Sequence, residues 1–288
     1  MAQKPLFFLH LPRTAGTTID AILERHFAPQ EVLKVYDAQE YGKHRTHSQE
    51  ELAGYRYITG HLLLTGMAPP TFCDTEVDVF TLLREPIGRL VSEYRFLRTW
   101  DKNHLYHKLN KGNVSFGEYV SSETYSLKFR GKNFMTRCIS GRGFNASYPV
   151  AALATAKKNL ERVFVFFGLQ ERFLESLLLL GDMLGVQDLL HERRNALKTD
   201  HDIPVSEDDL ALARELNRAD IELYAFAEAL FAERVAARGP EFQKRVQTLS
   251  LLNGKFQKIS SILYQHAARG EVGNMSRGIE LPKESRWQ

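Results

Sequence analysis

A run of small, polar and basic residues stands between an apolar stretch and a helical pattern near the start of the chain. Its residues are Arg13, Thr14, Ala15, Gly16, Thr17 and Thr18. Backbone N–H groups at the start of a helix lack partners within the helix and favour an anion. Gly16 lets the backbone approach a ligand closely, while the guanidinium and hydroxyl groups add charge and hydrogen-bond donors. The run therefore indicates a phosphate site, although a simple turn with Thr17 or Thr18 as the helix cap fits it equally well.

Arg84 and Ser92 form a second candidate anion site. Arg84 follows the apolar run VDVFTLL, and Ser92 lies about two turns into the helical pattern that starts at Pro86. Arginine binds phosphate through paired hydrogen bonds, and a serine hydroxyl can complete such a site. A surface ion pair from Arg84 to Glu85 or Glu93 is the alternative. Because both candidate sites follow strands, at the edge of a parallel sheet where ligands bind, they suggest one ligand with two separated phosphates.

The loop lacks the features of a nucleotide triphosphatase. The motif G-x-x-x-x-G-K-[ST] needs a lysine after its second glycine, but Thr17 follows Gly16, and no glycine lies five residues earlier. The strand that ends at Arg84 supplies no aspartate for Mg²⁺. A P-loop-type kinase is therefore disfavoured, and a noncatalytic nucleotide-binding protein of the same fold is a further alternative. We expect no metal requirement.

The composition is that of an ordinary globular protein. The 288 residues carry a formal net charge of +3, with a pI near 8.7. This suits an anionic ligand but is too weakly basic to indicate a nucleic-acid-binding protein. The two cysteines, Cys73 and Cys138, form no metal-binding pattern and fit a reducing compartment. No apolar run approaches the roughly 18 residues of a membrane span, and no signal peptide is apparent, so we expect a cytoplasmic protein.

Segments with strand and helix patterns alternate along most of the chain. Apolar runs predict strands at residues 6–11, 57–61, 77–83 and 162–169, and periodicity predicts helices at 16–27, 86–100, 150–161, 171–184 and 206–238. Ser206 is expected to cap the last helix, and residues 102–148 predict short helices and loops. The alternation indicates an α/β fold with a mainly parallel sheet covered on both faces. We expect one domain over residues 1–270 and a polar, flexible tail over residues 271–288.

Two segments resemble the nucleotide-binding motifs of sulfotransferases that use 3′-phosphoadenosine 5′-phosphosulfate (PAPS). HLPRTAGTT resembles their 5′-phosphosulfate loop, and LREPIGRLVSEYRF resembles their 3′-phosphate motif, an arginine followed eight residues later by a serine. The similarity is to the carbohydrate type, the family of heparan sulfate 2-O-sulfotransferase and uronyl 2-sulfotransferase. Three further segments, ITGHL, NFMTRCISG and VFVFFGLQERFLESLLLL, agree with it.

This resemblance covers most of residues 6–235 and implies a P-loop-like three-layer α/β/α sandwich, the sulfotransferase fold. It also implies PAPS as the co-substrate, the bisphosphate PAP as its product and a carbohydrate as the acceptor, with anionic polysaccharides among the candidates. The implied reaction is in-line attack of an acceptor hydroxyl on sulfur. Its catalysis would come from positioning and from neutralisation of the leaving phosphate.

The resemblance assigns roles to individual residues. Arg13 and the loop residues after it would hold the 5′-phosphate, namely Thr14, Ala15, Gly16, Thr17 and Thr18. Arg84 and Ser92 would hold the 3′-phosphate, and His61 would be the catalytic base, with His10 as a weaker candidate. Arg13 stands where the family has lysine and would neutralise the leaving phosphate. Thr59 stands where the heparan enzyme has a second histidine, a difference that concerns the acceptor.

A basic cluster in the loop-rich segment is the candidate acceptor surface. It comprises Lys128, Arg130, Lys132, Arg137 and Arg142, with Tyr125, Phe129 and Phe134 between them. Such a surface suits an acidic or hydroxylated glycan, but a solvated basic face with aromatic anchors would look the same. Asn133 and Arg137 are the candidate acceptor-binding residues, because they fall in the matching segment NFMTRCISG.

Overall fold

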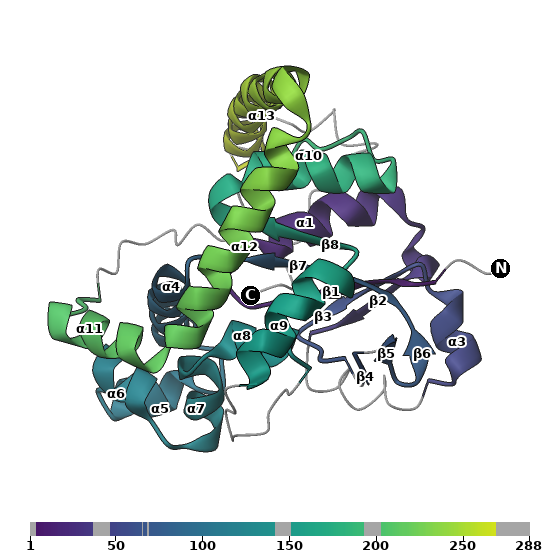
Figure 1. Ribbon diagram of the computed structural model, residues 1–288. Coiled ribbons are helices and arrows are strands. Elements are labelled where there is room, and N and C mark those ends of the chain that lie inside the picture. Colours follow the sequence, from purple (N-terminus) through teal and green to yellow (C-terminus); the bar gives the residue numbers. More distant parts are fainter. Residues whose placement is uncertain are drawn as a thin grey trace.

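Five parallel strands form the central sheet of the computed structural model, in the order β2-β3-β1-β7-β8 (Figure 1). Their bounds are β1 (Leu6–Leu9), β2 (Val32–Val35), β3 (Tyr57–Gly60), β7 (Asp78–Leu83) and β8 (Phe166–Leu169). Leu6 of β1 pairs with Tyr57 of β3 on one side and with Asp78 of β7 on the other. The structure describes residues 4–36, 47–64, 66–67, 69–141, 151–192 and 203–268.

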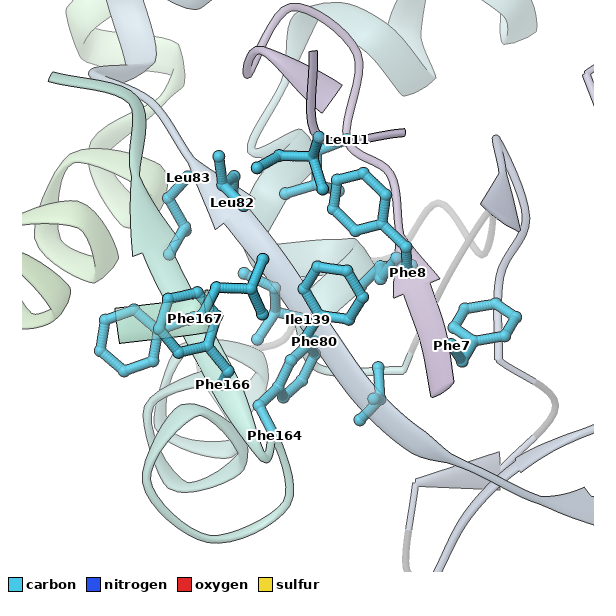
Figure 2. Close-up of a cluster of buried hydrophobic side chains, with 14 of the residues drawn as sticks. Phe7, Phe8, Leu11, Phe80, Leu82, Leu83, Ile139, Phe164, Phe166 and Phe167 are labelled. Carbon is cyan, nitrogen blue, oxygen red and sulfur yellow. The ribbon is translucent and has the colours of Figure 1, made fainter. Parts of the chain in front are cut away.

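The strands are apolar because both faces of the sheet are covered. Phe7, Phe8 and Phe80 are fully buried, and Phe8 stacks on Phe80 with the ring centroids 4.6 Å apart (Figure 2). Successive side chains of a strand point to opposite faces, so an unbroken apolar run such as LFFL supplies both faces with core side chains. This packing holds the carboxyl ends of β1, β3 and β7 beside one another.

Helices lie on both faces of the sheet (Figure 1). They include α1 (Gly16–Leu23), α3 (Gln49–Gly54), α4 (Pro86–Thr99), α9 (Ala151–Arg162), α10 (Phe173–Leu184), α12 (Arg218–Ala236) and α13 (Gly239–Ala268). Single 3₁₀ turns occur at η1 (Glu24–His26), η2 (Pro29–Glu31) and η4 (Gln170–Arg172). The predicted α/β sandwich with a parallel central sheet is confirmed. In the part of the chain that the structure describes, no helix combines the length and apolarity needed to span a membrane.

A second hydrophobic cluster lies beside the sheet, among short helices that pack on α4. These are α5 (Tyr106–Lys111), α6 (Phe116–Ser121), α7 (Tyr125–Gly131), α8 (Phe134–Ile139) and α11 (Glu207–Leu216), of which all but α8 contribute to the cluster. At its centre the ring of Tyr94 contacts those of Phe116 and Tyr119. The prediction of short helices in this segment is confirmed for residues 102–141. A small antiparallel sheet, β4 (Gly66–Met67), β5 (Pro70–Phe72) and β6 (Thr75–Glu76), completes the fold.

One predicted helix is wrong. Residues 206–238 form two helices, α11 and α12, because the backbone of Asn217 leaves the helical region at φ −119° and ψ 28°. Asn217 is fully buried, and its side-chain amide donates to the backbone carbonyl of Gly131. Ser206 does cap α11, since its hydroxyl accepts from the backbone N–H of Asp209 at 3.1 Å.

The remaining differences concern the ends of elements and elements that the sequence patterns did not indicate. The first strand stops at Leu9 rather than at residue 11, and β2 and α13 were not anticipated. The tail at residues 271–288 lies outside the described residues. The boundary of a single domain at residue 270 stays a prediction.

Candidate functional site

The loop between β1 and α1 takes a strained path. Arg13 and Ala15 lie in the left-handed region, with φ values of 67° and 69°, which residues other than glycine seldom adopt. Ala15 stands at the N-cap of α1 with no side-chain cap, and the first turn of the helix holds no acidic residue. Ala15 thus offers no side-chain acceptor to the first N–H groups of α1, whose partial positive charge favours an anion. Strain of this kind tends to persist where a ligand site needs the geometry.

The threonines of the loop differ in their surroundings. Thr14 is fully buried, and its hydroxyl donates to the carbonyl of Leu11 at 2.7 Å, so it holds the turn together. Thr18 is also buried, whereas Thr17 is half-buried. The hydroxyl proton of Thr14 is therefore engaged within the turn, and the role of Thr14 in binding the 5′-phosphate stays a prediction.

Gly16 leaves room for a histidine. A Cβ atom at this position would stand 1.9 Å from Nε2 of His10, well inside van der Waals contact. The imidazole of His10, which comes from the end of β1, thus occupies the space beside the first residue of α1. Only a residue without a side chain fits here, so the glycine is needed for packing, whereas the left-handed positions of the turn are occupied by Arg13 and Ala15.

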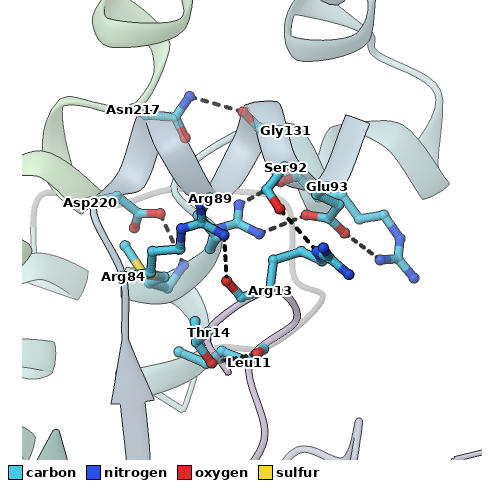
Figure 3. Close-up of polar contacts among 12 residues, drawn as sticks. Leu11, Arg13, Thr14, Arg84, Arg89, Ser92, Glu93, Gly131, Asn217 and Asp220 are labelled. Atoms are coloured by element: carbon cyan, nitrogen blue, oxygen red, sulfur yellow. Dashed lines mark hydrogen bonds and ion pairs between the residues drawn. The ribbon is translucent and has the colours of Figure 1, made fainter. Parts of the chain in front are cut away.

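The two predicted anion sites meet in space. Arg84 follows β7, and its Nη1 donates to the backbone carbonyl of Arg13 at 3.1 Å (Figure 3). The Nε of Arg13 in turn donates to the hydroxyl of Ser92 on α4, also at 3.1 Å. Thus Arg13, Arg84 and Ser92 form one continuous group at neighbouring strand ends.

The carboxylates considered as ion-pair partners for Arg84 are engaged elsewhere. Glu85 is the N-cap of α4 and accepts from the backbone N–H groups of Ile87 and Gly88. Glu93 is buried and pairs with Arg89 and Arg130 at 2.6 and 2.5 Å. The guanidinium of Arg84 is thereby directed to the loop rather than to Glu85 or Glu93.

This group carries partly desolvated positive charge. Burial lowers the pKa of Arg13, and the repulsion of the nearby Arg84 lowers it further. Burial likewise lowers the pKa of Arg84, and the charge of Arg89 lowers it further, whereas the negative charges of Glu171 and Glu85 oppose this shift. Two guanidinium groups that are partly desolvated and repel each other are stabilised by an anion between them. Together with the start of α1, they make a site suited to phosphate groups.

His61 stands at the end of β3, directly after Gly60. Its Nδ1 lies 3.1 Å from the backbone carbonyl of His10. A carbonyl can only accept, so Nδ1 carries the proton and Nε2 of the neutral ring is the basic nitrogen. Burial lowers the pKa of His61 below its ordinary value of 6.5, and the positive charges of His10, when protonated, and of Arg130 lower it further. The hydrogen bond to the backbone of His10 and the negative charge of Glu93 oppose this shift. A neutral His61 can accept a proton near pH 7.

A cavity of about 210 Å³ adjoins the loop and His61. Its polar lining includes His10, His61, His104 and Arg130, and most of the other lining residues are apolar: Leu9, Leu11, Pro12, Leu62, Leu63, Phe129, Phe134 and Cys138. Arg130 belongs to the basic cluster of the sequence, but its place was not foreseen, because it depends on the ion pair with Glu93 from another helix. His104 was missed altogether, since nothing in its local sequence marks it.

Asn133 and Arg137 do not line this cavity. The side chain of Asn133 donates to the carbonyl of Leu216 and accepts from the N–H of Ala219, so it joins α11 to α12. Arg137 is buried, and its guanidinium lies 4.9 Å from the ring centre of Phe129. These contacts support the packing of the segment, and the predicted acceptor contacts of both residues stay a prediction.

Comparisons with known proteins give little beyond this geometry. No protein-family model matches the chain, and no curated protein matches it. Among solved structures, a mouse sulfotransferase complexed with PAP aligns with a TM-score of 0.35 and 14% sequence identity. The alignment covers 74% of this chain and 63% of the mouse protein, so this chain spans under two thirds of its length. A likeness this weak supports no conclusion about function. Within the described residues, no group of three or more His, Cys, Asp or Glu side chains is placed to hold a metal ion.

Proposed function

We propose that this chain is a sulfotransferase that moves a sulfuryl group from PAPS to a hydroxyl of a carbohydrate acceptor. One observation carries the proposal: Arg84 at the end of β7 touches Arg13 in the loop after β1, and Arg13 touches Ser92. A nucleotide with phosphates on both sides of its ribose can be held at both ends by such a group. The resemblance of the two sequence motifs assigns the 5′ end of the nucleotide to the loop after β1 and its 3′-phosphate to Arg84 and Ser92.

The 5′-phosphosulfate would lie on the loop, where the N–H groups that open α1 and the guanidinium of Arg13 face it. Arg84 and Ser92 would hold the 3′-phosphate. Positive charge preorganised in this way favours the leaving phosphate as its charge develops, without reorganisation during the reaction. Arg13 is the group that neutralises this charge.

The acceptor would enter from the cavity beside His61. As the acceptor oxygen forms its bond to sulfur, its proton passes to Nε2 of His61, and the bond from sulfur to the bridging phosphate oxygen breaks to release PAP. When both substrates are bound in this fixed geometry, the entropy cost of bringing them together has been met on binding, so the barrier of the chemical step is lower. The apolar walls of the cavity suit one face of a sugar ring, and Arg130 suits an anionic substituent on it.

The first test is the selectivity of nucleotide binding. We expect PAP to raise the thermal unfolding temperature of the protein more than ADP, AMP or ATP at equal concentration. Of these nucleotides, only PAP carries a 3′-phosphate as well as a 5′-phosphate. At 100 times its Kd, a ligand adds about 2.7 kcal/mol of stability. Stabilisation by ATP equal to that by PAP would contradict the proposal.

A matched pair of variants tests the 3′-phosphate site. Arg84→Ala should raise the Kd for PAP by about 10- to 100-fold, since a hydrogen bond to a charged group contributes about 1.5–3 kcal/mol. Arg95→Ala is the control on the adjoining helix, because the guanidinium of Arg95 donates to the carbonyl of Ile203. An equal loss in both variants would remove Arg84 from the site.

Transfer itself is measured with labelled PAPS and a panel of polysaccharides and simple sugars. Label found on any of these acceptors supports the proposal. PAP binding without transfer to any acceptor would favour a noncatalytic binding protein, and Mg²⁺-dependent ATP turnover would favour a kinase.

A further inference from the structure

The guanidinium of Arg13 lies over the ring of Phe96. Its Cζ atom stands 4.7 Å from the ring centre, within the distance at which a cation is attracted to the face of an aromatic ring. Phe96 belongs to α4, and both side chains are half-buried. Because this attraction grows as water is excluded, the ring can hold the guanidinium in place.

A second contact with the same helix orients Arg13. Its Nε donates to the hydroxyl of Ser92 at 3.1 Å. Ser92 and Phe96 are four residues apart on α4, and residues at this spacing lie on one face of a helix. Arg13 is thus held at two points one turn apart, the first polar and the second aromatic, and the two together define its orientation better than either alone.

Trp100 supports the ring of Phe96. Trp100 directly follows α4, and the centres of the two rings are 5.2 Å apart with an angle of 34° between their planes. Aromatic pairs at this separation add stability beyond the area that they bury. The ring under Arg13 therefore has a fixed position of its own.

These contacts leave part of the guanidinium available to a ligand. Its charge is spread over a plane, so a guanidinium can lie on an aromatic ring and still donate through its edge. Nε is engaged by Ser92, whereas within the described residues neither Nη group of Arg13 makes a hydrogen bond or an ion pair. Two Nη groups on a held guanidinium suit the oxygens of a phosphate.

We propose that Phe96 is a positioning residue that acts through Arg13, holding its guanidinium against α4 so that the Nη groups stay available to a phosphate on the loop after β1. The contact between Phe96 and Arg13 needs no nucleotide. Its effect on nucleotide binding rests on the proposed function.

Three variants separate this role from simple packing. Phe96→Leu keeps an apolar side chain but removes the aromatic face, and Phe96→Tyr keeps the face. Phe226→Leu is the matched control, because Phe226 is also a half-buried helical residue, on α12, with Nζ of Lys157 5.5 Å from its ring centre.

The contact itself is read from ¹H–¹⁵N spectra of the arginine Nε–H groups in protein without nucleotide, with Arg13→Lys to assign the signal. Because the ring current of Phe96 shields protons over its face, the Arg13 signal should move downfield in Phe96→Leu. It should stay in place in Phe96→Tyr and in Phe226→Leu. An Arg13 signal that Phe96→Leu leaves unchanged would overturn the proposal.

Affinity for PAP gives the functional readout. Phe96→Leu should raise the Kd for PAP about fivefold, in line with the strength of a partly desolvated cation–π contact, and Phe96→Tyr should leave it within about twofold. In an Arg13→Ala background, which lacks the cation, adding Phe96→Leu should change the Kd by less than about twofold.

A loss in that background as large as in the wild type would show that Phe96 acts by packing alone, and would overturn the proposal. An unchanged Kd in Phe96→Leu would do the same. If the wild type binds no PAP at all, the proposed function fails, while the nucleotide-free spectra still decide whether Phe96 holds Arg13.

Discussion

At the scale of single residues, His61 combines an exposed position with a fixed orientation. Its Nδ1 proton is held by the carbonyl of His10, and its pKa lies below 6.5. Because a lowered pKa keeps the ring neutral, we expect kcat/KM to stay level from pH 8 down through pH 6.5 and to fall only below that value. A rate that falls already on passing from pH 8 to pH 7 would contradict this assignment.

Replacement of His61 separates chemistry from binding. His61→Ala should lower the transfer rate by about 10²- to 10⁴-fold, the usual contribution of a general base, while the Kd for PAP changes less than about twofold. His107→Ala is the control, since His107 is an exposed histidine on α5. Transfer rates from labelled PAPS and PAP titrations measure the two effects. Full turnover by His61→Ala would exclude it as the base.

At the scale of the elements, the start of α1 depends on a glycine. Gly16→Ala would place a methyl group on the ring of His10, and such overpacking costs about 1–3 kcal/mol. We expect a lower free energy of unfolding in urea and, under the proposed function, weaker binding of PAP, because the displaced ring or loop disturbs the proposed anion site.

Gly54→Ala is the control for this substitution. Like Gly16, Gly54 lies in a helix, at the end of α3. Unlike Gly16 it is exposed, and an added Cβ would meet nothing within 4 Å. Its replacement should change stability by less than about 1 kcal/mol, in the direction of the higher helix propensity of alanine. Equal destabilisation by both substitutions would show that the contact with His10 is unimportant.

At the scale of the whole molecule, one buried ion-pair group lies between the two hydrophobic clusters. Glu93 of α4 forms ion pairs with Arg89 and with Arg130 on α7. Arg89 is fully buried, and its guanidinium lies 4.9 Å from the ring centre of Phe134. Burial opposes the ionisation of Glu93, but the two arginines outweigh it, and its pKa lies below 4.5. This contribution to stability is therefore complete above about pH 4.5 and is lost as the pH falls through the folded-state pKa.

Removal of the Glu93 charge should destabilise the whole chain. Glu93→Gln leaves two guanidinium groups without their shared carboxylate, and breaking a buried pair in this way costs about 3–5 kcal/mol. Urea unfolding at pH 7 measures the loss. Glu123→Gln is the control, because Glu123 forms the same kind of double pair, with Lys128 and Lys132, at the surface, and we expect little change. A small effect in both variants would show that Glu93 does not join the two clusters.

The sequence alone was enough to predict the α/β class and the meeting of the two candidate anion sites. Both follow from local rules: apolar runs form buried strands, and parallel strands end at one edge of a sheet, so Arg13 and Arg84 had to lie near one another. The break at Asn217 was not predictable in this way. The helical pattern continues across it, and the side chain of Asn217 is held at the break by hydrogen bonds to Gly131 and Asn133, 86 and 84 residues away.

Only the tertiary structure decided which hydrogen-bond and ion-pair partners the polar residues have. Asn133 and Arg130 lie in the same segment, yet one joins two helices and the other lines the cavity, because their partners come from α12 and α4. The partners of the buried Asp20 carboxyl group, Tyr36 and Tyr57, likewise come from other elements. Patterns along the chain determine which groups are available and at which edge of the sheet they lie. Packing determines their partners, because a buried charge or hydroxyl must be satisfied by whatever element the fold brings against it.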